Sequence, residues 1–179
     1  MFNVRRVAFF TILKRDTIFV MIKSLLIYKP KLEDMWFRQI LLEDEETMSY
    51  NRAWGGTIPF PKEDWKDWYN AWLGEKAPKD RYYRYLKNKD GDFVGEIALH
   101  YDDEYQGYIV NVIIYSKFRR RGYGKEALEI LCETAKEKGI TYLYDDIAID
   151  NPAISLFLKT GFNEQYRNKD IILLKKDLF

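Results

Sequence analysis

The sequence predicts an α+β or α/β domain built around one mixed sheet. Strand-like segments gather between residues 82 and 115, and strand-like and helical segments then alternate up to residue 175. In addition, residues 109–114 are almost continuously apolar, which is typical of a strand buried on both faces. This order of elements indicates a central sheet with helices packed against it.

Length and composition limit the possible functions. The 179 residues suffice for one domain with a substantial core, and the 17% aromatic content excludes disorder. Lys and Arg total 29 against 28 for Asp and Glu, so no global field favours nucleic acid or an anionic membrane. One Cys and one His exclude intramolecular disulfides and metal centres built from several such residues. We expect metal-free chemistry in the cytoplasm.

Residues 1–30 are expected to form an N-terminal extension of a single domain that covers residues 31–179. The apolar run Val7–Leu13 is broken by charged residues and is far shorter than the roughly 20 residues of a spanning helix, so neither a signal nor an anchor is expected. A second run, Ile18–Tyr28, contains Met21. Two interpretations stay open: translation begins at Met21, or both runs add a strand or helix to the domain.

Between residues 36 and 74 the pattern predicts a strand, two helices and a loop. Trp36–Leu42 is strand-like, and acidic residues then favour the start of a short helix that reaches Tyr50. Gly and Pro make Asn51–Pro61 a loop, and Pro61 is tolerated in the first turn of the next helix. That helix, ended by Gly74, places an apolar stripe in the core: Trp65, Trp68, Tyr69, Trp72 and Leu73.

The middle of the chain predicts three strands. Tyr82–Leu86 and Asp92–Tyr101 flank a turn in which Gly91 can adopt a positive φ. Tyr108–Tyr115 contains the continuous apolar run and should therefore be central in the sheet.

The last third alternates between helix and strand. The helices are predicted at Lys125–Lys138, ended by Gly139, and at Pro152–Lys159, ended by Gly161. The strands are predicted at Ile140–Ile149, interrupted by Asp145-Asp146, and at Asp170–Lys175.

A basic loop with two glycines joins the central strand to the first of these helices. Gly122 and Gly124 let the backbone approach a ligand closely, and the first helical turn presents unpaired N–H groups with a favourable dipole. Four side chains add positive charge: Arg119, Arg120, Arg121 and Lys125. The segment therefore predicts a site for phosphate or diphosphate.

This loop lacks the third glycine of a dinucleotide fingerprint and the spacing of a P-loop. It resembles the pyrophosphate loop of the GCN5-related N-acetyltransferase (GNAT) superfamily, R/Q-x-x-G-x-G/A, which Arg119, Gly122 and Gly124 match. Residues 150–162 are similar to the second signature of that superfamily, in which an Asn precedes a short helix that closes in Gly161-Phe162. The resemblance covers residues 96–179, and residues 36–92 loosely.

The resemblance implies a mostly antiparallel sheet flanked by helices, in which two parallel central strands splay apart and admit acetyl-CoA. The implied cofactor-binding residues are Val112, Ile113 and Ile114 for pantetheine, Arg120, Arg121, Gly122, Tyr123, Gly124 and Lys125 for the diphosphate, and in addition Arg119, Asn151 and Phe157. The chain departs from the family pattern at two positions. Arg120 stands where Gly is common, and Phe157 stands where many members have Tyr.

The implied reaction is direct transfer of acetyl from acetyl-CoA to a primary amine, of a small molecule, a protein N-terminus or a lysine. It needs a proton acceptor for the amine, and Glu96 and Asp145 are the predicted catalytic residues. His100 shares the strand face of Glu96 and is a further candidate. The alternatives are structural: Glu96 paired with an arginine, His100 satisfied in the fold, and Asp145 at a bulge or strand end. Tyr123, Tyr144 or Ser155 could protonate the thiolate, or it leaves unassisted.

Two other functions compete with this one. The missing tyrosine allows a noncatalytic acyl-CoA-binding module. A nucleic-acid patch over Lys117–Lys125 is disfavoured by nearby acidic residues and the near-zero net charge. For the acceptor we expect Trp36, Tyr50 and the loop Trp54–Phe60 to line an apolar site, or else to form core or a dimer surface, which leaves a homodimer open.

Overall fold

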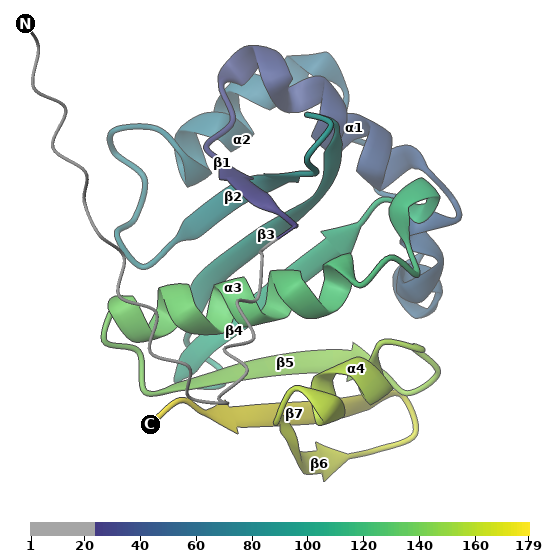
Figure 1. The fold of residues 1–179 in the computed structure, drawn as a ribbon, viewed down its shortest axis with the longest axis vertical. Helices are drawn as coiled ribbons and strands as arrows, with labels where there is room; N and C mark the ends of the chain where they lie inside the picture. Colours follow the sequence, from purple (N-terminus) through teal and green to yellow (C-terminus); the bar gives the residue numbers. More distant parts are fainter. Residues whose placement is uncertain (1–23) are drawn as a thin grey trace, which may run out of the picture.

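One mixed sheet forms the centre of the structure, a computed structural model that describes residues 24–179 (Figure 1). In this part of the chain seven strands follow the order β1-β2-β3-β4-β5-β7-β6. β4 is parallel to β5, and every other neighbouring pair is antiparallel. The bounds are β1 Leu26–Tyr28, β2 Tyr82–Lys87, β3 Phe93–Asp102, β4 Gly107–Ile114, β5 Tyr142–Ala148, β6 Asn163–Arg167 and β7 Ile171–Asp177. The predicted fold class is confirmed.

Most predictions for the N-terminal extension, including those for Val7–Leu13 and Met21, lie outside the described residues. The end of the expected extension belongs to the domain, because β1 pairs antiparallel with β2, with Ile27 opposite Leu86. The backbone N–H of Leu25 also donates to Glu126 in the helix that follows the glycine loop.

Helices cover both faces of the sheet. Their bounds are α1 Met35–Glu43, α2 Trp65–Trp72, α3 Tyr123–Glu137 and α4 Ile154–Lys159, with a 3₁₀ segment at Thr47–Trp54. One core cluster packs α1 and α2 against side chains such as Tyr85 and Ile113, and the other packs α3 and α4 against side chains such as Val110 and Leu174. No helix within residues 24–179 has the length and apolar character needed to cross a membrane.

The segment Trp36–Leu42 lies in α1, so its prediction as a strand was wrong. Its buried residues recur at helical spacing, with Phe37 and Leu41 facing the core, whereas Trp36 is 45% exposed. A short apolar run fits either structure, and here packing against the sheet decides. The predicted short helix up to Tyr50 is the 3₁₀ segment, which extends four residues further into the expected loop.

The remaining elements agree with the sequence prediction, with three corrections. α3 begins at Tyr123, two residues before the predicted start. β5 continues through Asp145-Asp146 in unbroken register with β7, so the predicted interruption was wrong. β6, whose five residues are all exposed, was not predicted. The aromatic stripe of α2 packs against the core, as expected.

β4 and β5 separate part-way along their length. Tyr108 pairs with Leu143 and Ile109 with Tyr144, and within the described chain the ladder between these strands ends there. On the other sides, β3 follows β4 to Ile114, and β7 follows β5 to its end at Ala148. The expected splay of two parallel central strands is therefore present, and it leaves strand backbone available to another partner.

Candidate active site

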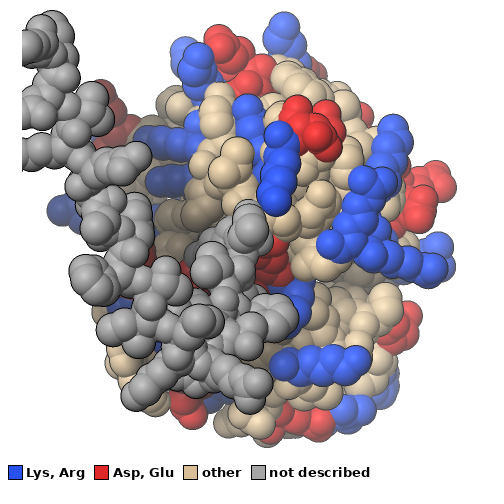
Figure 2. Space-filling model, in the orientation of Figure 1, with Lys and Arg blue, Asp and Glu red and all other residues tan. Residues whose placement is uncertain are grey.

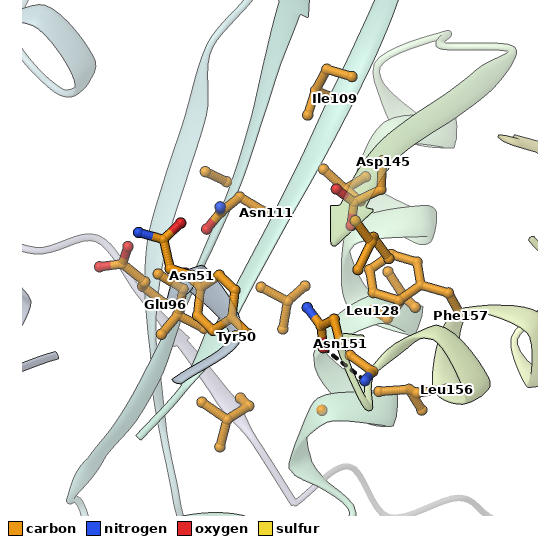
Figure 3. Close-up of a pocket in the computed structure, with 18 of the residues that line it drawn as sticks. Tyr50, Asn51, Glu96, Ile109, Asn111, Leu128, Asp145, Asn151, Leu156 and Phe157 are labelled. Carbon is orange, nitrogen blue, oxygen red and sulfur yellow. Dashed lines mark hydrogen bonds between the residues drawn. The ribbon is translucent and has the colours of Figure 1, made fainter. Parts of the chain in front are cut away.

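A cavity of about 930 Å³ opens where β4 and β5 diverge (Figure 3). Its lining joins the glycine loop and the starts of α3 and α4 to the aromatic side chains of the 3₁₀ segment and α2. The sheet contributes β3, β4 and β5. Of the predicted site residues, the cavity brings together Glu96, Asp145, Val112, Ile113, Ile114, Arg119, Arg120, Gly122, Tyr123, Gly124, Lys125, Asn151 and Phe157.

Gly122 immediately precedes α3 and has a φ of +84°. A Cβ at this position would meet no atom within 4 Å, so the space beside the Gly122 backbone is open. Gly124 serves a different purpose, because a Cβ there would lie 3.2 Å from Cδ2 of Leu156 in α4. The first glycine thus exposes the backbone at the start of α3, and the second allows α3 to pack closely on α4.

The arginines of the loop have separate roles. Arg119 donates to the carbonyl oxygens of Ile114, Glu46 and Thr47 at 3.2, 3.0 and 2.5 Å, so it fastens the loop to the 3₁₀ segment. Arg121 lies outside the cavity lining, with its guanidinium 5.4 Å from the ring centre of Phe118. Figure 2 shows basic side chains gathered over the loop between β4 and α3.

The two other basic side chains, Arg120 and Lys125, line the cavity, where they can contact an anion. Lys125 also pairs with Glu129 at 3.2 Å on the exposed surface of α3. Arg120 has a φ of +60°, a left-handed conformation that favours glycine. The departure from the family pattern at this position therefore keeps the backbone shape that a glycine would adopt and adds a guanidinium.

Glu96 is fully engaged by neighbouring side chains. It is 1% exposed, one carboxylate oxygen pairs with Arg38 of α1, and the other accepts a hydrogen bond from the Tyr83 hydroxyl. The Arg38 guanidinium lies 4.2 Å from the ring centre of Trp68. The structural alternative for Glu96 is thus present, with Arg38 as its partner, although the group also lines the cavity. Arg38 and Trp68 were not assigned to the site from the sequence.

Asp145 follows directly after the last β5 residue that pairs with β4. Within residues 24–179 no side chain forms an ion pair or hydrogen bond with its carboxyl group, and the donor near it is the backbone N–H of Asp146. Burial raises the pKa of Asp145 well above 3.8, and the negative charge of Asp146 raises it further. The cavity therefore holds an acidic group that binds its proton more tightly than an exposed Asp does.

Asp145→Asn is expected to raise the free energy of unfolding near pH 7. With its raised pKa, the folded protein binds the Asp145 proton more tightly than the unfolded chain does. The native residue thus loses stability as pH rises from about 3.8 through the folded-state pKa. Urea unfolding of both proteins should show a gap that narrows as pH is lowered toward about 4. Equal stabilities throughout would contradict this expectation.

His100 lies on the face of β3 that carries Glu96, also in the cavity lining. Burial lowers its pKa from 6.5, so the imidazole is neutral near pH 7. Its Nδ1 is buried and has no hydrogen-bond partner among the described residues. The ring lies 5.9 Å from that of Trp72, edge to face. His100 is thus a neutral base beside the aromatic end of the cavity.

The lining of this cavity can also be compared with the remaining predicted site residues. Tyr123 reaches it, whereas Tyr144 and Ser155 are not among its lining residues, and Ser155 donates to the carbonyl of Pro152. Tyr50 and Trp54 line the cavity, whereas Trp36 lies outside its lining and packs on Phe37 and Phe93, which agrees with the core or surface alternative for this residue. Asn111, which points into the cavity in Figure 3, was missed because a lone Asn in an apolar strand gives no motif.

A diverging parallel pair of strands beside a loop with two glycines is the arrangement that the resemblance to the GNAT superfamily implies. A family model described as the acetyltransferase (GNAT) family matches residues 39–162. The chain belongs to this family.

Individual proteins agree with this assignment. The uncharacterized N-acetyltransferase YycN of Bacillus subtilis (strain 168) is 32% identical over 95 residues, which are 51% of this chain and only 58% of that protein. Spermidine N-acetyltransferase from Vibrio cholerae in complex with CoA and spermine has a TM-score of 0.72 at 15% identity, over 87% of this chain and 96% of that chain. A GNAT-family acetyltransferase from Bacillus anthracis has a TM-score of 0.70 at 20% identity, with the same coverage. These two structures share the fold.

Proposed function

We propose that this protein transfers the acetyl group of acetyl-CoA to a primary amine by direct attack. The observation that carries the proposal is the cavity, which runs from the bare glycine backbone at α3, along the diverged edge of β4, to an aromatic end on the opposite face of the sheet. Such a shape suits a long cofactor at one end and an acceptor at the other.

The cofactor end fits the two chemically different parts of coenzyme A. The N–H groups at the start of α3, with Arg120 and Lys125, would hold the diphosphate. The backbone of Val112–Ile114, which β5 does not pair with, would bond the amides of pantetheine as another strand would. Asn151 would contribute by shaping the wall, since its Oδ1 accepts the N–H of Ala153 at 2.8 Å and fixes the start of α4.

The acceptor end lies on the α1–α2 face. Tyr50, Trp54, Trp68 and Trp72 supply flat apolar surface for the body of an amine. Glu96, His100 and Asp102 are the titratable groups of β3 that share this face and line the cavity, and we assign the amine proton to Glu96 or His100. The proposal also places the enzyme in the cytoplasm, where the free, buried thiol of Cys132 would stay reduced.

The test is an acceptor screen with purified protein and acetyl-CoA. A panel of an aliphatic diamine, an aromatic monoamine and a peptide with a free N-terminus is followed by release of free thiol, and calorimetry measures CoA binding separately. Turnover with at least one amine is expected. Tight CoA binding without turnover on a broad panel would favour the noncatalytic acyl-CoA-binding module, and absence of CoA binding would reject both functions.

Two glycines that flank α3 allow the cofactor loop to be tested with a matched control. Gly122 and Gly139 lie at opposite ends of this helix with φ of +84° and +76°, and a Cβ would meet nothing within 4 Å at either position. Gly122→Ala and Gly139→Ala should each lower the free energy of unfolding by about 1–2 kcal/mol, because both force a side chain into the left-handed region. Only Gly122→Ala should also weaken CoA binding, as measured by calorimetry. Equal CoA affinity in both variants would place the diphosphate elsewhere.

A further inference from the structure

The wall of the cavity beside α4 lacks the hydroxyl group that many relatives carry. Phe157 is 5% exposed, packs edge to face on Phe162 at 5.0 Å, and lines the cavity. Its ring has no proton to donate. If acetyl transfer occurs here, as proposed above, the departing sulfur must obtain its proton from another group or leave as a thiolate.

Asp145 lies on the same face of the sheet as Phe157. Its cross-strand partner on β7 is Leu174, and Leu143 and Ile147, two residues away on either side, share its face. All three belong to the core cluster that contains Phe157 and α3. Figure 3 shows Asp145 and Phe157 on one side of the cavity, opposite Glu96 and Tyr50.

This placement separates Asp145 from the acceptor end. Glu96 and His100 share the face of Ala98, which belongs to the cluster of α1 and α2. Asp145 instead faces the α3–α4 side, where the glycine loop would hold the cofactor. A proton on Asp145 would therefore lie on the cofactor side of the sheet, where the sulfur of coenzyme A can accept it. The amine would approach from the α1–α2 side. The base role predicted for Asp145 from the sequence requires the opposite placement.

We propose that Asp145, as a neutral carboxylic acid, protonates the sulfur of coenzyme A when the acetyl group leaves. The amine lone pair forms the new C–N bond, the C–S bond breaks, and its electron pair remains on sulfur. The Asp145 proton moves to that sulfur and gives the free thiol. The amine releases one proton on the opposite face, and solvent returns a proton to Asp145, so the step balances.

The surroundings of Asp145 favour the protonated form that this role needs. Among the elements around it, α3 and α4 contribute the apolar Leu128 and Phe157 to the cavity wall, and β7 contributes Leu174. The charged neighbour is Asp146 on its own strand, and Tyr50 of the 3₁₀ segment also senses its charge. Burial and Asp146 both raise the pKa of Asp145, as described above.

The experiment compares kcat as a function of pH for wild type, Asp145→Asn, Asp177→Asn and the double variant Asp145→Asn/Phe157→Tyr. Asp177 is a control, because it removes the same charge from neighbouring β7 at an exposed position outside the cavity lining. We expect Asp145→Asn to lower kcat about 100-fold, the usual size of a general-acid effect, with little change in KM for acetyl-CoA. The decline of wild-type kcat at alkaline pH should vanish in this variant. The phenol of Phe157→Tyr should restore part of kcat.

The outcomes separate the two proposals. Asp145→Asn with wild-type kcat, or loss of the acidic rather than the alkaline limb of the profile, would overturn the acid role while the transferase function stands. A kcat loss that Phe157→Tyr does not rescue in a correctly folded protein would also overturn it. Wild type that binds CoA but turns over no amine would instead defeat the proposed function and the inference with it.

Discussion

Glu96→Gln is expected to lower the free energy of unfolding by about 3–5 kcal/mol, because it leaves the charge of Arg38 without a partner in the interior. The side chains of Arg38 and Glu96 are 16% and 2% exposed, so solvent screens this pair little. The Tyr83 hydroxyl still finds an acceptor in the glutamine, which isolates the loss of the ion pair. Urea unfolding near pH 7 measures the change.

Two further variants make this result specific. Glu33→Gln breaks the ion pair with Lys31, whose side chains are 75% and 70% exposed, and should change stability little. Arg38→Met combined with Glu96→Gln removes both charges and should recover most of the loss. A Glu96→Gln variant as stable as Glu33→Gln would contradict the buried pair. A loss of activity in Glu96→Gln supports Glu96 as the proton acceptor only if the urea experiment shows that this variant is folded under the assay conditions.

Gly95→Ala is expected to disrupt β3 and β4 beside the cofactor slot. A Cβ at Gly95 would overlap the carbonyl oxygen of Ile113 and lie 2.9 Å from Cδ1 of Ile114. The two strands must move apart there, at a cost of about 1–3 kcal/mol in the free energy of unfolding. Because β4 carries the backbone assigned to pantetheine, CoA affinity should fall as well. Calorimetric titration and urea unfolding measure the two effects.

The matched control is Gly91→Ala, in the turn between β2 and β3. A Cβ at Gly91 meets no atom within 4 Å, but its φ of +89° strains any other residue. This variant should lose stability and keep its CoA affinity. If Gly95→Ala also kept its CoA affinity, the backbone of β4 would not be the pantetheine site.

The parts of the site that could be predicted depend on local signals. Gly122 and Gly124 predict an anion loop, because the two glycines, the basic residues and the start of the helix lie within a few residues of sequence. The central strand was found for the same reason, since burial on both faces leaves a continuous apolar run. Both features need only neighbouring residues to be interpreted.

Long-range pairing could not be predicted. Arg38 meets Glu96 across 58 residues of sequence, and nothing near either residue indicates the other. The segment around Trp36 was assigned to a strand, because its period becomes clear only when the sheet decides which side chains are buried. β6 was missed because its exposed residues Asn163–Arg167 carry no apolar pattern, and it forms by pairing with β7.

The separation of β4 from β5 also determines what can enter the molecule. It creates two strand edges inside the fold, and unpaired edges on a protein surface readily recruit other polypeptides. Here these edges open into a cavity walled by α3, α4 and the 3₁₀ segment. A folded sheet from another chain would collide with those walls, whereas a thin, unbranched arm with its own amides can slide between them. The architecture thus leaves these two strand edges accessible to a thin ligand and inaccessible to a folded sheet.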